Sequence, residues 1–120
     1  MHRERLEQMV VMLRGLPPDG AVGFDLEKWH CGTTACAVGH ACVTAAFTNQ
    51  GLGLRGNARG KMMPAFAGEV EWDAVCEFFE IGDGNAEHLF AANRYISGGN
   101  TAPAEVADRI ESFLAEHAET

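Results

Sequence analysis

Apolar residues recur every three or four positions near the start of the chain, which is the spacing of one face of an α-helix. In residues 3–14 they are Leu6, Met9, Val10 and Leu13. A glycine and a pair of prolines follow, and both residue types end helices. We therefore predict an amphipathic helix over residues 3–14.

The same spacing returns in the second half of the chain and predicts three more helices. The first starts at Glu69 and ends at Gly82, and a short one follows with Asp83 as its cap. The last helix is capped by Thr101 and carries Pro103 in its first turn, where proline is tolerated. Its expected buried stripe comprises Val106, Ile110, Phe113 and Leu114.

A further helix is predicted from composition rather than from spacing. Residues 35–47 are mostly Ala, Cys, Gly, Val and Thr and contain no Asp, Glu, Lys or Arg. Residues 32–34 offer a threonine hydroxyl that can cap the first backbone amides. A segment this small and uncharged is the best candidate for a central buried helix. Before it, residues 19–23 are turn-like, and residues 24–29 could form a single helical turn.

Residues 51–64 fit no regular pattern, because they contain four glycines and a proline. We expect a long irregular connection here, with an irregular hairpin as the alternative. Taken together, the segments predict an all-α fold. It is a single domain over residues 1–120, with about five helices around the central small-residue helix and a long glycine-rich loop.

The net charge of the chain disfavours some classes of binding partner. The chain of 120 residues has a formal net charge of −8, from 17 acidic and 9 basic residues. Such a balance repels phosphate backbones and anionic membranes. Arg55, Arg59 and Lys61 form one basic cluster that could hold a phosphate, but a solvated loop accounts for it better. We therefore expect neither a membrane nor a nucleic acid as partner.

The N-terminal region contains no apolar run that would suit a signal peptide or a membrane span. We therefore expect a cytoplasmic protein. In that compartment the four cysteines are expected to be reduced, metal-bound or redox-active rather than paired in structural disulfides.

Candidate chemistry concentrates in residues 30–42, which hold three of the four cysteines and two of the five histidines. His30, Cys31, Cys36 and His40 offer two sulfurs and two nitrogens, the ligand set of a tetrahedral zinc site. On a helix, Cys36 and His40 would share one face. The Cys-x-x-Cys knuckle typical of zinc sites is absent, so zinc binding remains an alternative hypothesis.

A thiol catalyst is a second alternative. Cys36 would lie in the first turn of a helix, where the dipole favours thiolate, and His40 could move its proton. Cys31 could act as a resolving thiol. The leading interpretation is structural instead: Cys36 serves for its small size, and Gly39 lets another helix approach closely. His40 is then a satisfied interior histidine.

The segment over residues 29–41 resembles one in a family of small uncharacterised bacterial and phage proteins. They share the pattern C-G-T-x-x-C-x-x-G-x-A. The family has no established activity, so the resemblance implies no catalytic residue. Its members often carry tryptophan at the position of His40, which leaves Cys31 and Cys36 as the defining pair. The likeness continues in three further segments: residues 78–82, 86–90 and 101–106.

These observations predict a small cytoplasmic helical protein that binds a protein partner, or a second copy of itself as a homodimer, without catalysis. In this hypothesis the cysteine segment joins the turn at Trp29 to the buried helix. The alternative is a zinc-binding or thiol-reactive protein that uses Cys31, Cys36 and His40.

Overall fold

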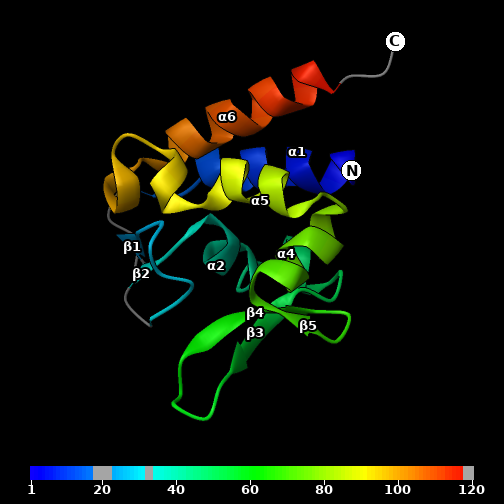
Figure 1. Cartoon of the computed structure of the whole chain (residues 1–120), viewed down its shortest axis with the longest axis vertical. Helices are drawn as coiled ribbons and strands as arrows, with labels where there is room; N and C mark the ends of the chain where they lie inside the picture. Colours follow the sequence, from blue (N-terminus) through cyan, green and yellow to red (C-terminus); the bar gives the residue numbers. More distant parts are fainter. Residues whose placement is uncertain (18–22, 32–33, 118–120) are drawn as a thin grey trace.

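Three helices lie at one side of the molecule and a small antiparallel sheet at the other, with a short buried helix between them (Figure 1). This computed structural model describes residues 1–17, 23–31 and 34–117. The chain is mixed α/β, so the predicted all-α fold is wrong.

Helices α1 (Arg3–Arg14) and α6 (Pro103–Glu116) run antiparallel, side by side, with α5 (Asp83–Phe90) beside them (Figure 1). The prediction for residues 3–14 is confirmed, since α1 has the expected ends. It buries Leu6, Met9 and Leu13. The predicted stripe of α6 is also confirmed as buried, because its apolar residues recur at helical spacing.

The expected caps of two helices are wrong by one residue. Ala102, not Thr101, precedes α6, and the Thr101 hydroxyl donates instead to the Gly98 carbonyl at 2.7 Å. Gly82, not Asp83, precedes α5. Helix α4 (Glu71–Phe79) starts two residues later than expected, because residues 69–70 belong to a strand.

The segment predicted to be an irregular connection forms most of a three-stranded antiparallel sheet. Strands β3 (Gly53–Gly56), β4 (Met62–Phe66) and β5 (Glu69–Val70) lie in that order. The hairpin alternative for residues 51–64 is therefore the correct one. Strand β5 pairs only with Ala65 and Phe66, so Pro64 lies where β4 has a neighbour on one side only.

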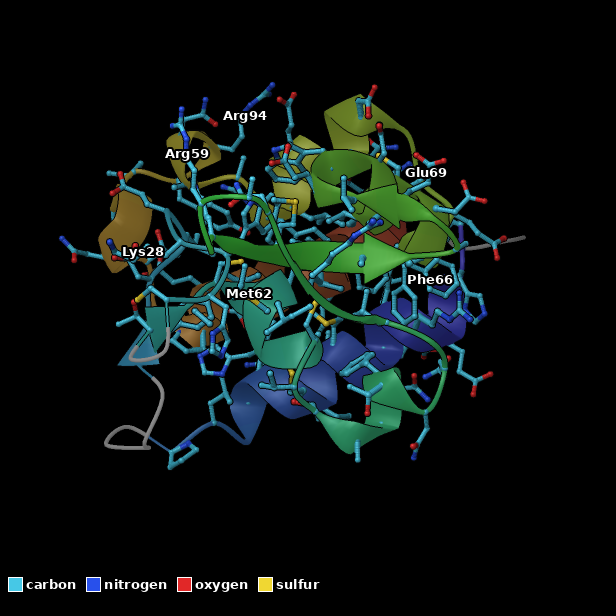
Figure 2. All side chains as sticks on the ribbon, turned by 90° about the horizontal axis from the view of Figure 1, so that it is seen from below. Lys28, Arg59, Met62, Phe66, Glu69 and Arg94 are labelled. Carbon is cyan, nitrogen blue, oxygen red and sulfur yellow. The ribbon has the colours of Figure 1, made fainter. Side chains whose placement is uncertain are left out.

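The sequence of the turn between β4 and β5 is not typical of a hairpin. Its two central residues, Ala67 and Gly68, have φ of 53° and 86°. Positive φ at both positions is the signature of a tight hairpin turn, but Asn-Gly or Asp-Gly is the usual sequence there. Figure 2 shows Phe66 and Glu69 at one end of the sheet and Arg59 towards the other. The basic cluster of Arg55, Arg59 and Lys61 is exposed.

The predicted central helix over residues 35–47 is also corrected. Residues 34–35 form β2 (Thr34–Ala35), which pairs in parallel with β1 (Gly23–Phe24). The rest divides into α2 (Ala37–Ala41) and α3 (Ala45–Thr48). The break falls at Thr44, which is extended and donates its hydroxyl to the His40 carbonyl at 2.7 Å. Such a side-chain bond competes with helix continuation.

The central position predicted for this segment is nevertheless confirmed, because every residue of α2 is buried. The single helical turn expected over residues 24–29 is confirmed only in part: the Lys28 N–H donates to the Asp25 carbonyl at 3.2 Å, which closes a turn over residues 25–28, whereas Phe24 belongs to β1. Residues 18–22, where most of a turn was predicted, and residues 32–33 lie outside the described residues. Thr34, the remaining candidate for the helix cap, is not the cap: it belongs to β2, and Cys36 precedes α2. Among the helices described, none is long and apolar enough to cross a membrane.

Candidate functional site

Cys36 is the N-cap of α2, and its sulfur is bound to the backbone. The Gly39 N–H donates to Sγ at 3.3 Å, and Sγ lies 3.9 Å from the Trp29 carbonyl oxygen. The side chain is 2% exposed. Burial raises the pKa of the thiol to about 11, outweighing the opposing backbone hydrogen bonds. The thiol is therefore protonated at neutral pH, and it can cap the helix and donate to Trp29 at once.

Gly39 shows why the segment needs a residue without a side chain. A Cβ built on Gly39 would lie 1.6 Å from the Trp29 carbonyl oxygen and 2.8 Å from its carbon. The element that approaches Gly39 is thus the turn that contains Trp29, and the expectation of a second helix at this point is wrong. The Trp29 carbonyl therefore lies close to both Cys36 and Gly39.

His40 is an interior histidine with a satisfied ring nitrogen. Its Nε2 lies 2.8 Å from the Gly23 carbonyl oxygen, and its ring stacks on Phe24 with centroids 5.8 Å apart. The residue is 6% exposed. Burial lowers the pKa of His40, the bond to Gly23 opposes this, and His30 adds to the lowering. Since a carbonyl can only accept, Nε2 carries a proton, and the lowered pKa favours the neutral ring.

The side chains of Cys36 and His40 do not face one another as a nucleophile and its base would. The hydrogen bond between these residues joins the His40 N–H to the Cys36 carbonyl, at 2.9 Å. The thiol and the imidazole each have their own backbone partners. Cys31 is exposed, with Sγ 2.9 Å from the Thr34 hydroxyl. The backbone of His30 forms bridges to Ala35 and Met62.

In residues 1–17, 23–31 and 34–117 no group of three or more His, Cys, Asp or Glu side chains is arranged to hold a metal ion. The four ligands that the sequence suggested for zinc, His30, Cys31, Cys36 and His40, are therefore not assembled into a site there. The physical reason lies in Cys36 and His40, because Sγ of Cys36 and Nε2 of His40 are directed at backbone groups.

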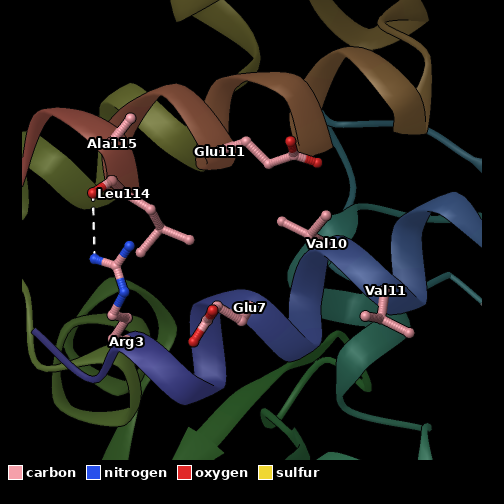
Figure 3. A pocket seen from close by; sticks show the side chains of 7 residues that line it. All are labelled: Arg3, Glu7, Val10, Val11, Glu111, Leu114 and Ala115. Carbon is pink, nitrogen blue, oxygen red and sulfur yellow. Dashed lines mark hydrogen bonds between the residues drawn. The ribbon is translucent and has the colours of Figure 1, made fainter. Parts of the chain in front are cut away.

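A different surface has the form of a binding site, and sequence reasoning missed it. Helix α1 separates two grooves, of about 440 Å³ against α6 and about 510 Å³ against α3. Figure 3 shows the first groove, with Val10 facing α6 and Arg3 bonded to the Leu114 carbonyl at one end. We call the two grooves and the ridge between them the α1 face. Glu7 and Val11 line both grooves and form that ridge.

Val11 gives the α1 face its apolar centre, because 74% of this residue is exposed. Met12, Ala46 and Phe47 line the groove against α3. The signal was present in the sequence: residues 9–12 are four consecutive apolar residues, and at 3.6 residues per turn they extend around most of the helix, beyond a single face. Three carboxylates and one guanidinium line the α1 face, those of Glu4, Glu7, Glu111 and Arg3.

The carboxylates of Glu4 and Glu7 are available to a partner. The ion pairs formed within the described part of the chain are those of Arg14, with Asp108 and Glu111, and of Arg94 with Glu87. Neither arginine reaches Glu4 or Glu7. The α1 face therefore combines the exposed side chain of Val11 with two carboxylates, those of Glu4 and Glu7, that form no ion pair within the described residues.

Comparisons of the chain with protein-family models, curated proteins and solved structures found no match. The resemblance to a family of bacterial and phage proteins therefore remains a prediction.

Proposed function

We propose that this is a non-catalytic binding protein that docks a basic amphipathic helix of a partner protein on its α1 face. One observation carries the proposal: Val11, 74% exposed, stands between two grooves that carboxylates border. An amphipathic helix can lay its apolar side along such grooves. Burying the remaining surface of Val11 would contribute about 1–2 kcal/mol to binding.

Charge favours a basic partner over a second copy of the chain. A symmetric dimer through the α1 face would bring Glu4 and Glu7 of both copies together, on molecules that each carry a formal net charge of −8. Lysines or arginines beside the apolar stripe of a partner helix would instead neutralise these carboxylates. Exposed pairs of this kind act mainly on specificity and association rate.

We propose a non-catalytic protein because the environment of the Cys36 thiol, the candidate nucleophile, does not favour catalysis. Cys36 is buried, its pKa is raised to about 11, and its sulfur is bound to backbone groups. A catalytic thiol needs the opposite environment, exposed and with a lowered pKa.

Titration with two designed peptides tests the proposal. Both are 14-residue peptides patterned as amphipathic helices, with leucine at positions i, i+3, i+4 and i+7, one with lysine and one with glutamate at the remaining positions. Calorimetry is expected to detect the leucine–lysine peptide only. Val11→Asp should weaken its binding about tenfold, which corresponds to about 1.4 kcal/mol. Ile96→Asp is the matched control, since Ile96 is fully exposed and lies outside the α1 face.

Equal binding of both peptides, or equal weakening by both variants, would contradict the proposal. Light scattering gives a second test. A dimer of the wild-type chain that Val11→Asp dissociates would assign the α1 face to a second copy and refute the basic partner.

A further inference from the structure

Both tryptophans of the chain line one cavity, and they come from distant segments. Trp29 and Trp72 are the two tryptophans in the sequence. Their rings meet edge to face with centroids 5.1 Å apart, and both residues are partly exposed. The cavity beside them has a volume of about 410 Å³. It shares no lining residue with the α1 face, so binding in this cavity is independent of the proposed function.

The position of Trp29 is fixed by the cysteine segment. Its carbonyl oxygen lies against Gly39 and within reach of the Cys36 thiol. The Lys28 carbonyl, one residue earlier, accepts from the Cys36 N–H at 2.6 Å. The N-terminal end of α2 thus fixes the backbone of the Trp29 turn, while the Trp29 indole lines the cavity. A wall held in this way is preorganised, which reduces the cost of binding a ligand.

Carboxylates contribute to the lining of the cavity. Glu27 and Glu87 line it from opposite segments of the chain. Helix α5 ends at Phe90, which also lines the cavity, and the C-terminal end of a helix carries partial negative charge. The faces of indole rings are electron-rich and attract cations. Three independent features of the cavity therefore favour a positively charged ligand.

One internal cation already competes for this site. The Arg94 guanidinium pairs with Glu87 at 3.2 Å, and these side chains are 47% and 46% exposed. An ion pair this exposed is weak, so a ligand can displace it. Cation–π contacts of the described arginines are formed by Arg5 and Arg109, with rings other than Trp29 and Trp72.

From this arrangement we infer that the cavity between Trp29 and Trp72 binds an alkylammonium group. The indoles contact the alkyl chain and the ammonium, and Glu27 and Glu87 neutralise its charge. A lysine side chain of a polypeptide and a small free amine share this chemistry.

Intrinsic tryptophan fluorescence reports on this cavity alone, because it contains both tryptophans. We would titrate the full chain with n-butylammonium chloride at constant ionic strength, and with n-butanol as the neutral probe of similar size. A saturable change with the amine and none with the alcohol is the expected result. An acetyl-Gly-Lys-Gly-amide peptide forms the second arm, and a preference for it would identify a lysine side chain as the source.

Matched variants make the test specific. Glu27→Gln and Glu87→Gln should each weaken amine binding about threefold or more, whereas Glu77→Gln, on the exposed side of α4, should leave it unchanged. Arg94→Gln should tighten binding, because it removes the competing cation. The inference is overturned if butanol saturates the signal equally, if Glu77→Gln has the same effect as the cavity variants, or if neither amine probe saturates.

Discussion

Replacing Gly39 with alanine tests how strictly the cysteine segment determines the fold. The new Cβ would lie 1.6 Å from the Trp29 carbonyl oxygen. Real Cβ atoms keep at least about 3.0 Å from such an atom, so α2 or the Trp29 turn must move by about 1.4 Å. Both elements are backbone, and no flexible side chain can yield.

The cost of this movement can be bounded from the structure. Ordinary overpacking of a core costs about 1–3 kcal/mol. Here the movement also disturbs the hydrogen bonds of Cys36 to the Lys28 carbonyl and to the Gly39 N–H. We expect Gly39→Ala to lower the free energy of unfolding by about 3 kcal/mol or more, and Tm by about 10 °C or more. Urea denaturation followed by circular dichroism measures the free energy.

Gly84→Ala is the matched control with the opposite expected sign. Gly84 lies within α5, and a Cβ added there would have nothing within 4 Å. Alanine is the better helix former, so this variant should gain about 0.5–1 kcal/mol. If Gly39→Ala unfolds within about 0.5 kcal/mol of the wild type, the close approach to Trp29 does not constrain the fold and our reasoning is refuted.

Three further predictions concern the same segment. Cys36→Ala should lose about 1–2 kcal/mol of stability with the helix cap, as measured in urea, and an unchanged midpoint would argue against capping. Iodoacetamide at about pH 7.5 should label the exposed Cys31 well before Cys36, whose pKa is raised to about 11, as peptide mass spectrometry can show; equal rates would contradict the burial. In the folded protein, burial lowers the pKa of the His40 imidazole below its ordinary value of 6.5. The unfolded chain therefore binds a proton at His40 more readily than the folded protein does. Its contribution to stability is therefore complete above pH 6.5 and lost as the pH falls below it, and His40→Gln should flatten the stability profile between about pH 7.5 and about pH 5.5.

The helices could be predicted where one face carries all the apolar residues. Helix α1 starts and ends where the spacing placed it, because packing against α6 selects the stripe that the sequence displays. The sheet could not be predicted in the same way. Strands β3 and β4 are short, β3 has glycine at both ends, and β4 contains Pro64, so neither shows the alternation that indicates a strand.

The candidate sites depend on contacts that spacing alone does not encode. The sequence indicated Cys36 and His40 as residues able to react or to bind a metal. The direction of their polar atoms, however, depends on Trp29 and Gly23, which tertiary structure brings close. Trp29 and Trp72 lie 43 positions apart in the chain and meet only through folding. The exposed Val11 is an exception, because the run of apolar residues around it already exceeded one helix face.

Hydrogen exchange with mass spectrometry tests the central claim, a docking surface on α1, most directly. Exchange is compared with and without a saturating amount of the leucine–lysine peptide. We expect slower exchange in the peptides that cover residues 3–14 and 44–48, which form the ridge and the wall of the larger groove. Protection confined to the sheet over residues 53–70, with α1 unchanged, would contradict the claim.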